Sequence, residues 1–223
     1  MFLHFHEKMP LKVRQAVAHA IDDARPILGK VTPFAQPAYS TTPSDRPFGL
    51  KKNEYERLRK QWPDVSRADL GPGATLTIEV MDEHAGLPLF RAVQKAVEKE
   101  CPFVKFKTFT RREFGQRLAE SDAMISPLGQ SPADPLPNLG ILARTRPGLS
   151  SVLRPNELAS LASLEDSDEF TEQLLDLNRR IHASRLLVPL FHFPGIVASS
   201  KKYERVEGLS FNWGIQTWTY RPR

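Results

Sequence analysis

The chain has 223 residues, 40% of them hydrophobic and 26% charged, and a formal net charge of +5. This length and composition are ordinary for one sizeable globular domain, or for a large domain with an appendage. They exclude a disulfide-stapled miniprotein, since Cys101 is the single cysteine. They also exclude a helical membrane protein, since no run of roughly 18 apolar residues occurs.

The positive charge is scattered along the chain. Its densest runs, at residues 57–60 and 111–112, fall on predicted helix surfaces, where solvated helix faces are the ordinary explanation. We therefore expect no nucleic-acid binding through this domain. Residues 1–8 lack the basic start and unbroken apolar run of a secretory signal. We expect either an export signal upstream in a longer product or a protein that is not exported.

The first predicted element is a helix that begins near Pro10, a residue suited to the first helical turn. One apolar face is made by Val13, Ala16, Val17, Ala20 and Ile21. The pattern breaks at residues 25–26, and the prolines of residues 31–50 predict a long loop that wraps a surface. Asp22 and Asp23 are neighbours that point in different directions, so they are not a paired acid–base device.

A short charged helix is predicted from Asn53 to about Gln61, because Asn53 followed by Glu56 has the spacing of a capping box. The Trp-Pro pair at residues 62–63 ends it. A Gly-Pro-Gly turn at residues 71–73 then separates this helix from the central part of the chain.

The central part of the chain alternates strands with helices. Strands are predicted at residues 75–80, 103–109 and 123–126, and helices at residues 87–100 and 110–120, the second opened by a capping box of Thr110 and Glu113. The short links imply parallel strands with right-handed crossovers and helices on the sheet faces. Ligands of such sheets bind at the carboxyl ends of the strands, so the loop after Ser126 is the expected site. Cys101, at the end of a helical pattern and among apolar and proline residues, is expected to be a packed thiol.

The last third of the chain is irregular at first. Residues 127–137 contain too much proline for a helix or a central strand. Helices are predicted at residues 155–161 and 168–186. Residues 187–193 form an apolar strand with a proline, which places this strand at a sheet edge or at a crossing. Further strands are expected at residues 195–199 and in the tail from 203 to 220, which holds Trp213 and Trp218.

The segment from Met9 to Asp22 resembles the "VRQA…AID" helix of the family 5 extracellular solute-binding proteins. These are the peptide- and nickel-binding partners of bacterial ABC importers, and the helix opens their second lobe. Asp134–Pro135 is similar to the "D-P" loop of the family, and residues 188–192 are similar to its "iPl.h" segment near the hinge. The resemblance implies a periplasmic-binding-protein-like α/β lobe (type II, cluster C-like) with a mostly parallel sheet flanked by helices.

The resemblance also implies a division of the chain and a set of ligand contacts. Residues 1–186 would form the lobe, and residues 187–223 the hinge-crossing strands and a tail that packs on this lobe or on a missing first lobe. The implied ligand-binding residues are Leu128, Gly129, Gln130, Ser131, Asp134 and His192.

One departure from the family pattern bears on the ligand. Peptide-binding members carry a tryptophan and then an aspartate before "D-P", and that aspartate holds the ammonium group of the ligand. Leu128 and Ser131 occupy the matching positions here. The usual contact with a peptide amino terminus is therefore not expected. Asp134 itself either contacts a ligand or fixes a turn before its proline.

Other chemistry finds little support in the sequence. His4 and His6 would share one face of a strand and could start a metal site, but no third ligand lies within sequence reach, so we expect no metal. No G-x-S-x-G, H-E-x-x-H, P-loop or dinucleotide fingerprint occurs, so we expect neither a catalytic site nor a cofactor.

Three functional hypotheses remain. The leading one is a non-enzymatic solute-binding lobe that takes a peptide or similar small polar ligand and delivers it to the membrane subunits of an ABC importer, outside the cytoplasm. The second is the ligand-sensing half of a cytoplasmic transcription regulator with a DNA-binding domain upstream. The third is a free-standing interaction domain, which predicts an exposed apolar patch larger than a few hundred Å².

Overall fold

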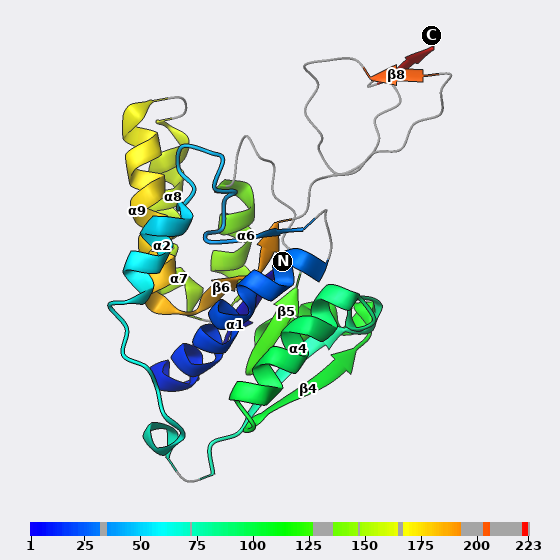
Figure 1. Cartoon of the computed structure of the whole chain (residues 1–223). Coiled ribbons are helices and arrows are strands. Elements are labelled where there is room, and N and C mark those ends of the chain that lie inside the picture. Colours follow the sequence, from blue (N-terminus) through cyan, green and yellow to red (C-terminus); the bar gives the residue numbers. More distant parts are fainter. Residues whose placement is uncertain are drawn as a thin grey trace.

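A five-stranded sheet with helices on both faces forms the body of the molecule (Figure 1). The computed structural model describes residues 1–31, 35–71, 73–126, 136–146, 148–164, 167–192, 203–205 and 220–222. Among these residues, no helix is both long and apolar enough to cross a bilayer.

The described elements follow in chain order. The strands are β1 (Phe2–Phe5), β2 (Gln36–Pro37), β3 (Leu76–Met81), β4 (Val104–Phe109), β5 (Ala123–Ser126), β6 (Leu187–Pro189), β7 (Phe191–His192), β8 (Tyr203–Arg205) and β9 (Tyr220–Pro222). The α-helices are α1 (Leu11–Val31), α2 (Lys52–Arg59), α3 (Asp82–Ala85), α4 (Pro88–Glu100), α5 (Phe114–Glu120), α6 (Leu136–Thr145), α7 (Leu149–Val152), α8 (Pro155–Ala162) and α9 (Asp168–Ser184). Two 3-10 turns are η1 (Arg67–Leu70) and η2 (Arg111–Glu113).

The main sheet has the strand order β4-β3-β5-β1-β6. The neighbours β4 and β5 both run parallel to β3, as the short βαβ links predicted. The strand β1 lies antiparallel to β5 and to β6, so β6 runs in the same direction as β3, β4 and β5. The mostly parallel α/β sheet expected from the sequence is confirmed, and the carboxyl ends of four strands meet at one edge.

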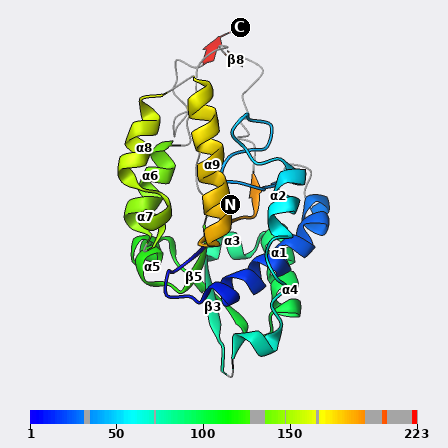
Figure 2. The same ribbon diagram turned by 90° about the vertical axis from the view of Figure 1, so that its left-hand side faces the viewer.

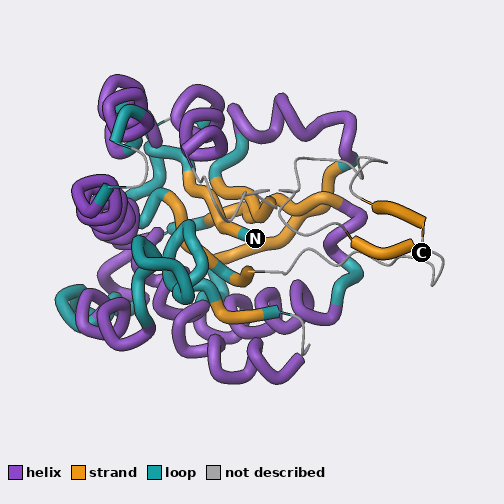
Figure 3. Tube along the Cα trace, turned by 90° about the horizontal axis from the view of Figure 1, so that it is seen from above, coloured by secondary structure: helices purple, strands orange, loops and turns teal. Residues whose placement is uncertain are grey.

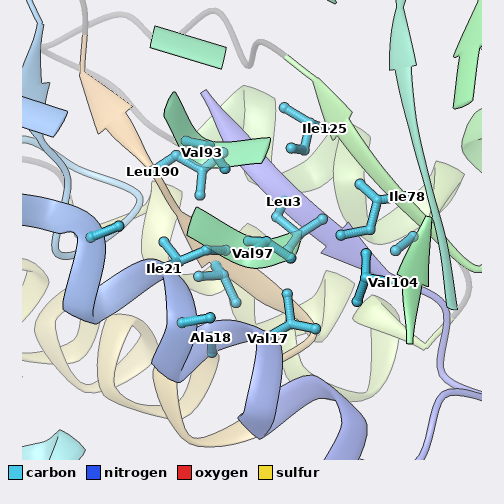
Figure 4. Packing of buried hydrophobic residues seen from close by; sticks show 14 of the residues in the cluster. Leu3, Val17, Ala18, Ile21, Ile78, Val93, Val97, Val104, Ile125 and Leu190 are labelled. Carbon is cyan, nitrogen blue, oxygen red and sulfur yellow. The ribbon is translucent and has the colours of Figure 1, made fainter. Parts of the chain in front are cut away.

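Helices α1 and α4 cover one face of the sheet (Figures 1 and 3). Val17 and Ile21 of the predicted apolar stripe are buried against Leu3 of β1 and Ile78 of β3 in the same core cluster (Figure 4). Val97 of α4 completes this packing. Burial of such side chains is the main term that holds the layers together, at roughly 1.5–3 kcal/mol for each large apolar residue.

The opposite face is covered by a layer of helices made of α6, α7, α8 and α9. Leu174 and Leu177 of α9 pack with Leu139 of α6 and Leu161 of α8, and Phe2 of β1 joins this cluster. Figure 2 shows α9 running between α6–α8 on one side and α2 on the other. Nearer to β4, helix α5 covers a smaller cluster that contains Met81, Phe109, Leu118 and Met124.

The predicted capping box at the start of the α5 region is present. Thr110 Oγ and Thr110 N both donate to Glu113 Oε2, at 2.8 Å and 2.9 Å. These bonds satisfy donors that a helix start leaves open, and they hold the pKa of Glu113 down at about 2. The turn is 3-10 at first and becomes α-helical at Phe114.

Three predicted boundaries are wrong. Helix α1 continues through Pro26 to Val31; Pro26 removes one backbone donor, but Arg25 is anchored by hydrogen bonds to neighbouring segments. Helix α2 begins at Lys52, and Asn53 is not its cap. The cap position is Lys51, two residues before Asn53. It directly follows buried Leu50, whose N–H is bonded to Ser40 Oγ at 3.0 Å and which fixes the chain where it enters the helix.

The proline-rich segment also ends sooner than predicted. Helix α6 begins at Leu136 and takes Pro137 into its first turn, where a missing backbone donor has no intrahelical partner to lose. The buried side chains of Leu139 and Leu142 provide the packing that stabilises this helix.

The long loop before α2 wraps a surface, as expected. Asn178 of α9 binds this loop at two places: its Oδ1 accepts from Thr41 Oγ1 at 2.7 Å, and its Nδ2 donates to the Phe48 carbonyl at 2.9 Å. The same loop contains β2, which pairs with β7.

Residues 187–193 were expected at a sheet edge or at a crossing, and the structure shows both. Strand β6 is the edge strand beside β1, and β7, after Leu190, leaves the main sheet to pair with β2. Strands β8 and β9 pair antiparallel in the tail. The strand expected at residues 195–199 and the positions of Trp213 and Trp218 lie outside the described residues.

Candidate ligand-binding edge

The carboxyl edge of the main sheet is organised around Phe2, the first residue of β1. Because β1 runs against its neighbours, Phe2 lies opposite Ser126, the last residue of β5, and opposite Pro189, the last residue of β6. The loop that the sequence marks as the ligand site leaves the sheet at Ser126. The crossing into β7 leaves it at Pro189. Phe2 therefore lies between the residue at which the predicted ligand loop begins, Ser126, and the residue at which the chain crosses into β7, Pro189.

Ser126 is fixed at this edge by His4. Ser126 Oγ and His4 Nε2 share a hydrogen bond of 2.8 Å, and both residues are buried. Burial lowers the pKa of His4 to about 3, with a further contribution from the Arg146 guanidinium. The neutral imidazole therefore acts as an uncharged hydrogen-bond partner at neutral pH.

The Ser126–His4 pair does not have the arrangement of a catalytic nucleophile. In the described part of the structure, His4 Nδ1 has no hydrogen-bond partner, so no carboxylate orients the ring. Ser126 is only 2% exposed and His4 is fully buried, so a substrate carbonyl cannot reach the hydroxyl. The pair orders the sheet edge.

His192 lies at the same edge, in β7. Its ring meets the Phe2 ring edge-on, with centroids 6.3 Å apart, and it is half-buried. Burial lowers the pKa of His192 to about 4, while hydrogen bonding to the backbone of Ser40 and Thr42 opposes this shift. Its Nε2 is itself buried, so it is a polar atom of the sheet edge that has no hydrogen-bond partner among the described residues.

The other predicted ligand residues, Leu128, Gly129, Gln130, Ser131 and Asp134, lie outside the described residues. The structure describes the residues on either side of this segment. The last described residue before the loop is Ser126, and the chain resumes at Leu136 in α6. Both of these flanking residues are buried.

The two N-terminal histidines do not come together. His4 is within β1, whereas His6 follows the end of the strand, and its Nδ1 accepts from Lys8 N at 3.1 Å. No group of three or more His, Cys, Asp or Glu side chains suited to a metal ion occurs among the residues that the structure describes. The expected packed thiol is confirmed, because Cys101 is buried.

The sequence did not reveal a buried ionic cluster behind this edge. Asp22 Oδ1 accepts from Arg25 Nε at 2.8 Å and from the Tyr55 hydroxyl at 2.6 Å. Arg59 lies over the other oxygen of Asp22, with its Nε 3.4 Å away, and pairs with Asp23 at 2.7 Å. The spacing of Asp22 and Arg25, three residues apart on one helix, was the available signal.

The prediction that Asp22 and Asp23 point in different directions is confirmed. The Asp22 side chain is 3% exposed and the Asp23 side chain is 67% exposed. The first belongs to the buried cluster and the second to the surface, as neighbouring helix positions require.

Comparison with known proteins gives matches by structure only. No protein-family model and no curated protein matches the sequence. Among solved structures, a dipeptide-binding protein from Pseudoalteromonas sp. SM9913 in complex with Met-Leu is matched over 100% of this chain and 48% of its own, with a TM-score of 0.68 and 17% identity. The Escherichia coli murein tripeptide-binding protein MppA is matched over 86% of this chain and 42% of its own (TM-score 0.59, 15% identity).

NikA from Brucella suis, solved in complex with Fe(III)-EDTA, is also similar, over 86% of this chain and 44% of its own (TM-score 0.56, 18% identity). The chain thus spans less than half the length of each of these proteins. They are family 5 solute-binding proteins, the family that the sequence resembles. The chain has the fold of a single lobe of the family 5 solute-binding proteins.

Proposed function

We propose that this chain is the second lobe of a solute-binding protein that presents a peptide-like or similar small polar ligand to an ABC importer. The observation that carries the proposal is the convergence of Ser126, Phe2 and His192 at the carboxyl edge of the sheet. Open α/β sheets bind ligands at this edge. Solved binding proteins with peptide ligands share the fold.

Binding in this proposal involves no covalent chemistry. The one serine–histidine pair described at the edge is buried and lacks an orienting carboxylate, which supports a non-enzymatic role. The loop with Leu128, Gln130, Ser131 and Asp134 would form one wall of the cleft, with His192 beside it. A first lobe would form the other wall and close on the ligand by hinge motion.

The proposal places the protein outside the cytoplasm as part of an exported product. The size of the native product in its source cells, measured by immunoblot against this domain, tests that arrangement. A species much larger than 25.2 kDa supports a two-lobe protein. Its upstream sequence then separates importer from regulator, because a signal peptide indicates an importer and a helix-turn-helix indicates a regulator. A species of 25.2 kDa contradicts ligand capture by lobe closure.

Ligand-linked stabilisation of that native product tests the binding function. Thermal unfolding is followed with short peptides, sugars and divalent metals added separately. A ligand at 100 times its Kd should stabilise the folded state by about 2.7 kcal/mol. If no peptide or other small polar solute stabilises the protein, the solute-binding proposal is wrong.

A pair of histidine variants locates the site. His192→Ala should weaken ligand binding, because it removes the imidazole that packs edge-on against Phe2 at the proposed cleft. His6→Ala, just beyond the end of β1 at the opposite edge of the sheet, is the matched control and should leave affinity unchanged. Equal effects of the two substitutions would remove His192 from the site.

A further inference from the structure

A cavity lies between α1, α2 and the loop around β2. Its volume is about 440 Å³, within the range of roughly 300–1,000 Å³ that small-molecule sites occupy. His192, the one predicted ligand residue among the described residues, does not line it. Its walls come from the second half of α1, from α2 and from the loop around β2, and its floor is formed by Arg25, Tyr39 and Tyr55.

The floor is held in place by Arg25, which is 5% exposed. Its Nη2 donates to the Tyr55 hydroxyl at 3.1 Å and to the Pro189 carbonyl at 2.8 Å. Its guanidinium also lies over both aromatic rings, 5.5 Å from the Tyr39 centroid and 5.0 Å from the Tyr55 centroid. These contacts join α1, α2 and the β6–β7 crossing, so the cavity is preformed.

The acidic groups of the lining are already engaged. Asp22 is bonded to Arg25 and Tyr55, and Asp23 is paired with Arg59 at 2.7 Å. Glu56 faces Lys52 at 3.8 Å. Each acidic side chain of the described lining is therefore paired with a basic one, and one basic side chain of the lining is left without an acidic partner among the described residues.

Lys60 is that remaining cation. It is exposed, it lines the cavity, and no acidic partner for its ammonium group occurs among the described residues. Among the described residues, the lining contains four basic side chains and three acidic ones, which gives it a net positive charge. Arg185, 1% exposed, lies over the Trp62 ring at 5.7 Å, and its positive charge acts on Tyr55 of the cavity. A surplus of positive charge beside a preformed cavity attracts anions.

We propose that this cavity binds a small organic anion, a carboxylate or phosphate monoester, that carries a flat apolar group. The anionic group would lie near Lys60, and the flat group would lie against Tyr39 and Pro37, which line the same cavity. An aromatic wall contacts flat groups through their faces. The cavity adjoins the β6–β7 crossing, where Arg25 is bonded to Pro189 and Pro37 pairs with Phe191, but the anion proposal does not depend on the solute-binding proposal.

Titration calorimetry of the whole chain with four aromatic probes tests this. Benzoate and phenyl phosphate carry the required negative charge, benzamide is the neutral analogue of benzoate, and benzylamine is the cationic control. We expect phenyl phosphate to bind most tightly, benzoate next, and the neutral and cationic probes several-fold more weakly. The preference should shrink as salt is raised from low to physiological ionic strength, since exposed charges are screened.

Two lysine substitutions locate the site. Lys60→Gln should weaken benzoate binding by about fivefold and leave benzamide unchanged. Lys95→Gln, on the exposed side of α4, is the matched control and should have no effect. Tyr39→Ala should weaken benzoate and benzamide alike.

Three results would each overturn the proposal. The first is that benzoate and phenyl phosphate both fail to bind at up to about 10 mM, a range that covers even weak sites. The second is that benzamide binds as tightly as benzoate. The third is that Lys60→Gln and Lys95→Gln change benzoate binding equally, which would place the anion elsewhere.

Discussion

Arg25 Nη2 donates a hydrogen bond of 2.8 Å to the carbonyl of Pro189, across 164 residues of sequence. This bond joins the first long helix to the point where the chain leaves the main sheet for β7. The same guanidinium also pairs with buried Asp22. Since arginine keeps its charge at all ordinary pH values, the connection between helix and crossing is permanent in the folded state.

Replacing Arg25 should therefore be costly. Arg25→Ala leaves the Asp22 carboxylate buried with its main cation removed, and such uncompensated charges typically cost about 3–5 kcal/mol. Urea denaturation followed by circular dichroism measures the change in the free energy of unfolding. Arg57→Ala, on the exposed side of α2, is the matched control and should change it by less than about 0.5 kcal/mol. A loss below about 1 kcal/mol for Arg25→Ala would mean that the cluster does not hold the crossing.

Much of this fold follows from local sequence patterns. The parallel strands β3, β4 and β5 alternate apolar and polar residues or carry β-branched ones, and the links between them are too short for other topologies. The Thr110–Glu113 capping box involves residues three apart, so it could be identified from spacing alone. Helix α9 also has a face of regularly spaced apolar residues.

The errors share a different cause, which is tertiary contact. Helix α1 passes Pro26 because Arg25 is bonded to segments far along the chain. Helix α2 begins before Asn53 because Leu50 is anchored by Ser40. No local rule includes such partners. For the site, the sequence pointed to the loop after Ser126, but the role of Phe2 between that loop and His192 depends on the antiparallel placement of β1.

Buried neutral histidine should make the fold less stable in mild acid. Burial lowers the pKa of His4 from 6.5 to about 3. Between these values the unfolded chain binds a proton that the folded chain excludes, so the stability is fully present above about pH 6.5 and is lost as the pH falls toward 3. From pH 7 to pH 5, His4 alone should account for a loss of about 2 kcal/mol.

The comparison of His4→Gln with wild type measures this contribution. Glutamine can still form a hydrogen bond with Ser126 but does not titrate, so the loss between pH 7 and pH 5 should be about 2 kcal/mol smaller in the variant. Parallel stability curves for wild type and His4→Gln would contradict the burial of a neutral His4.

The thiol of Cys101 should be chemically protected in the folded chain. It is 2% exposed, and burial raises its pKa to about 12. Because only the thiolate reacts, alkylation by iodoacetamide at pH 8 should be at least about 100-fold slower in the folded protein than in urea. Free glutathione, alkylated in both solutions, corrects for any effect of urea on the reagent. Similar rates in the two states would show that Cys101 is accessible.

Ser131 gives the most direct test of ligand type. The resemblance places it where peptide-binding relatives hold an aspartate that contacts the ammonium group of the ligand. In the native full-length product, Ser131→Asp should therefore raise affinity for peptides with a free amino terminus by about tenfold, the value of a charge-assisted hydrogen bond. N-acetylated peptides of the same sequence should gain nothing, because they lack the cation. Ser160→Asp, at an exposed position of α8, is the control for the effect of an added negative charge. An equal gain for free and acetylated peptides would mean that Ser131 does not face the amino terminus of the ligand.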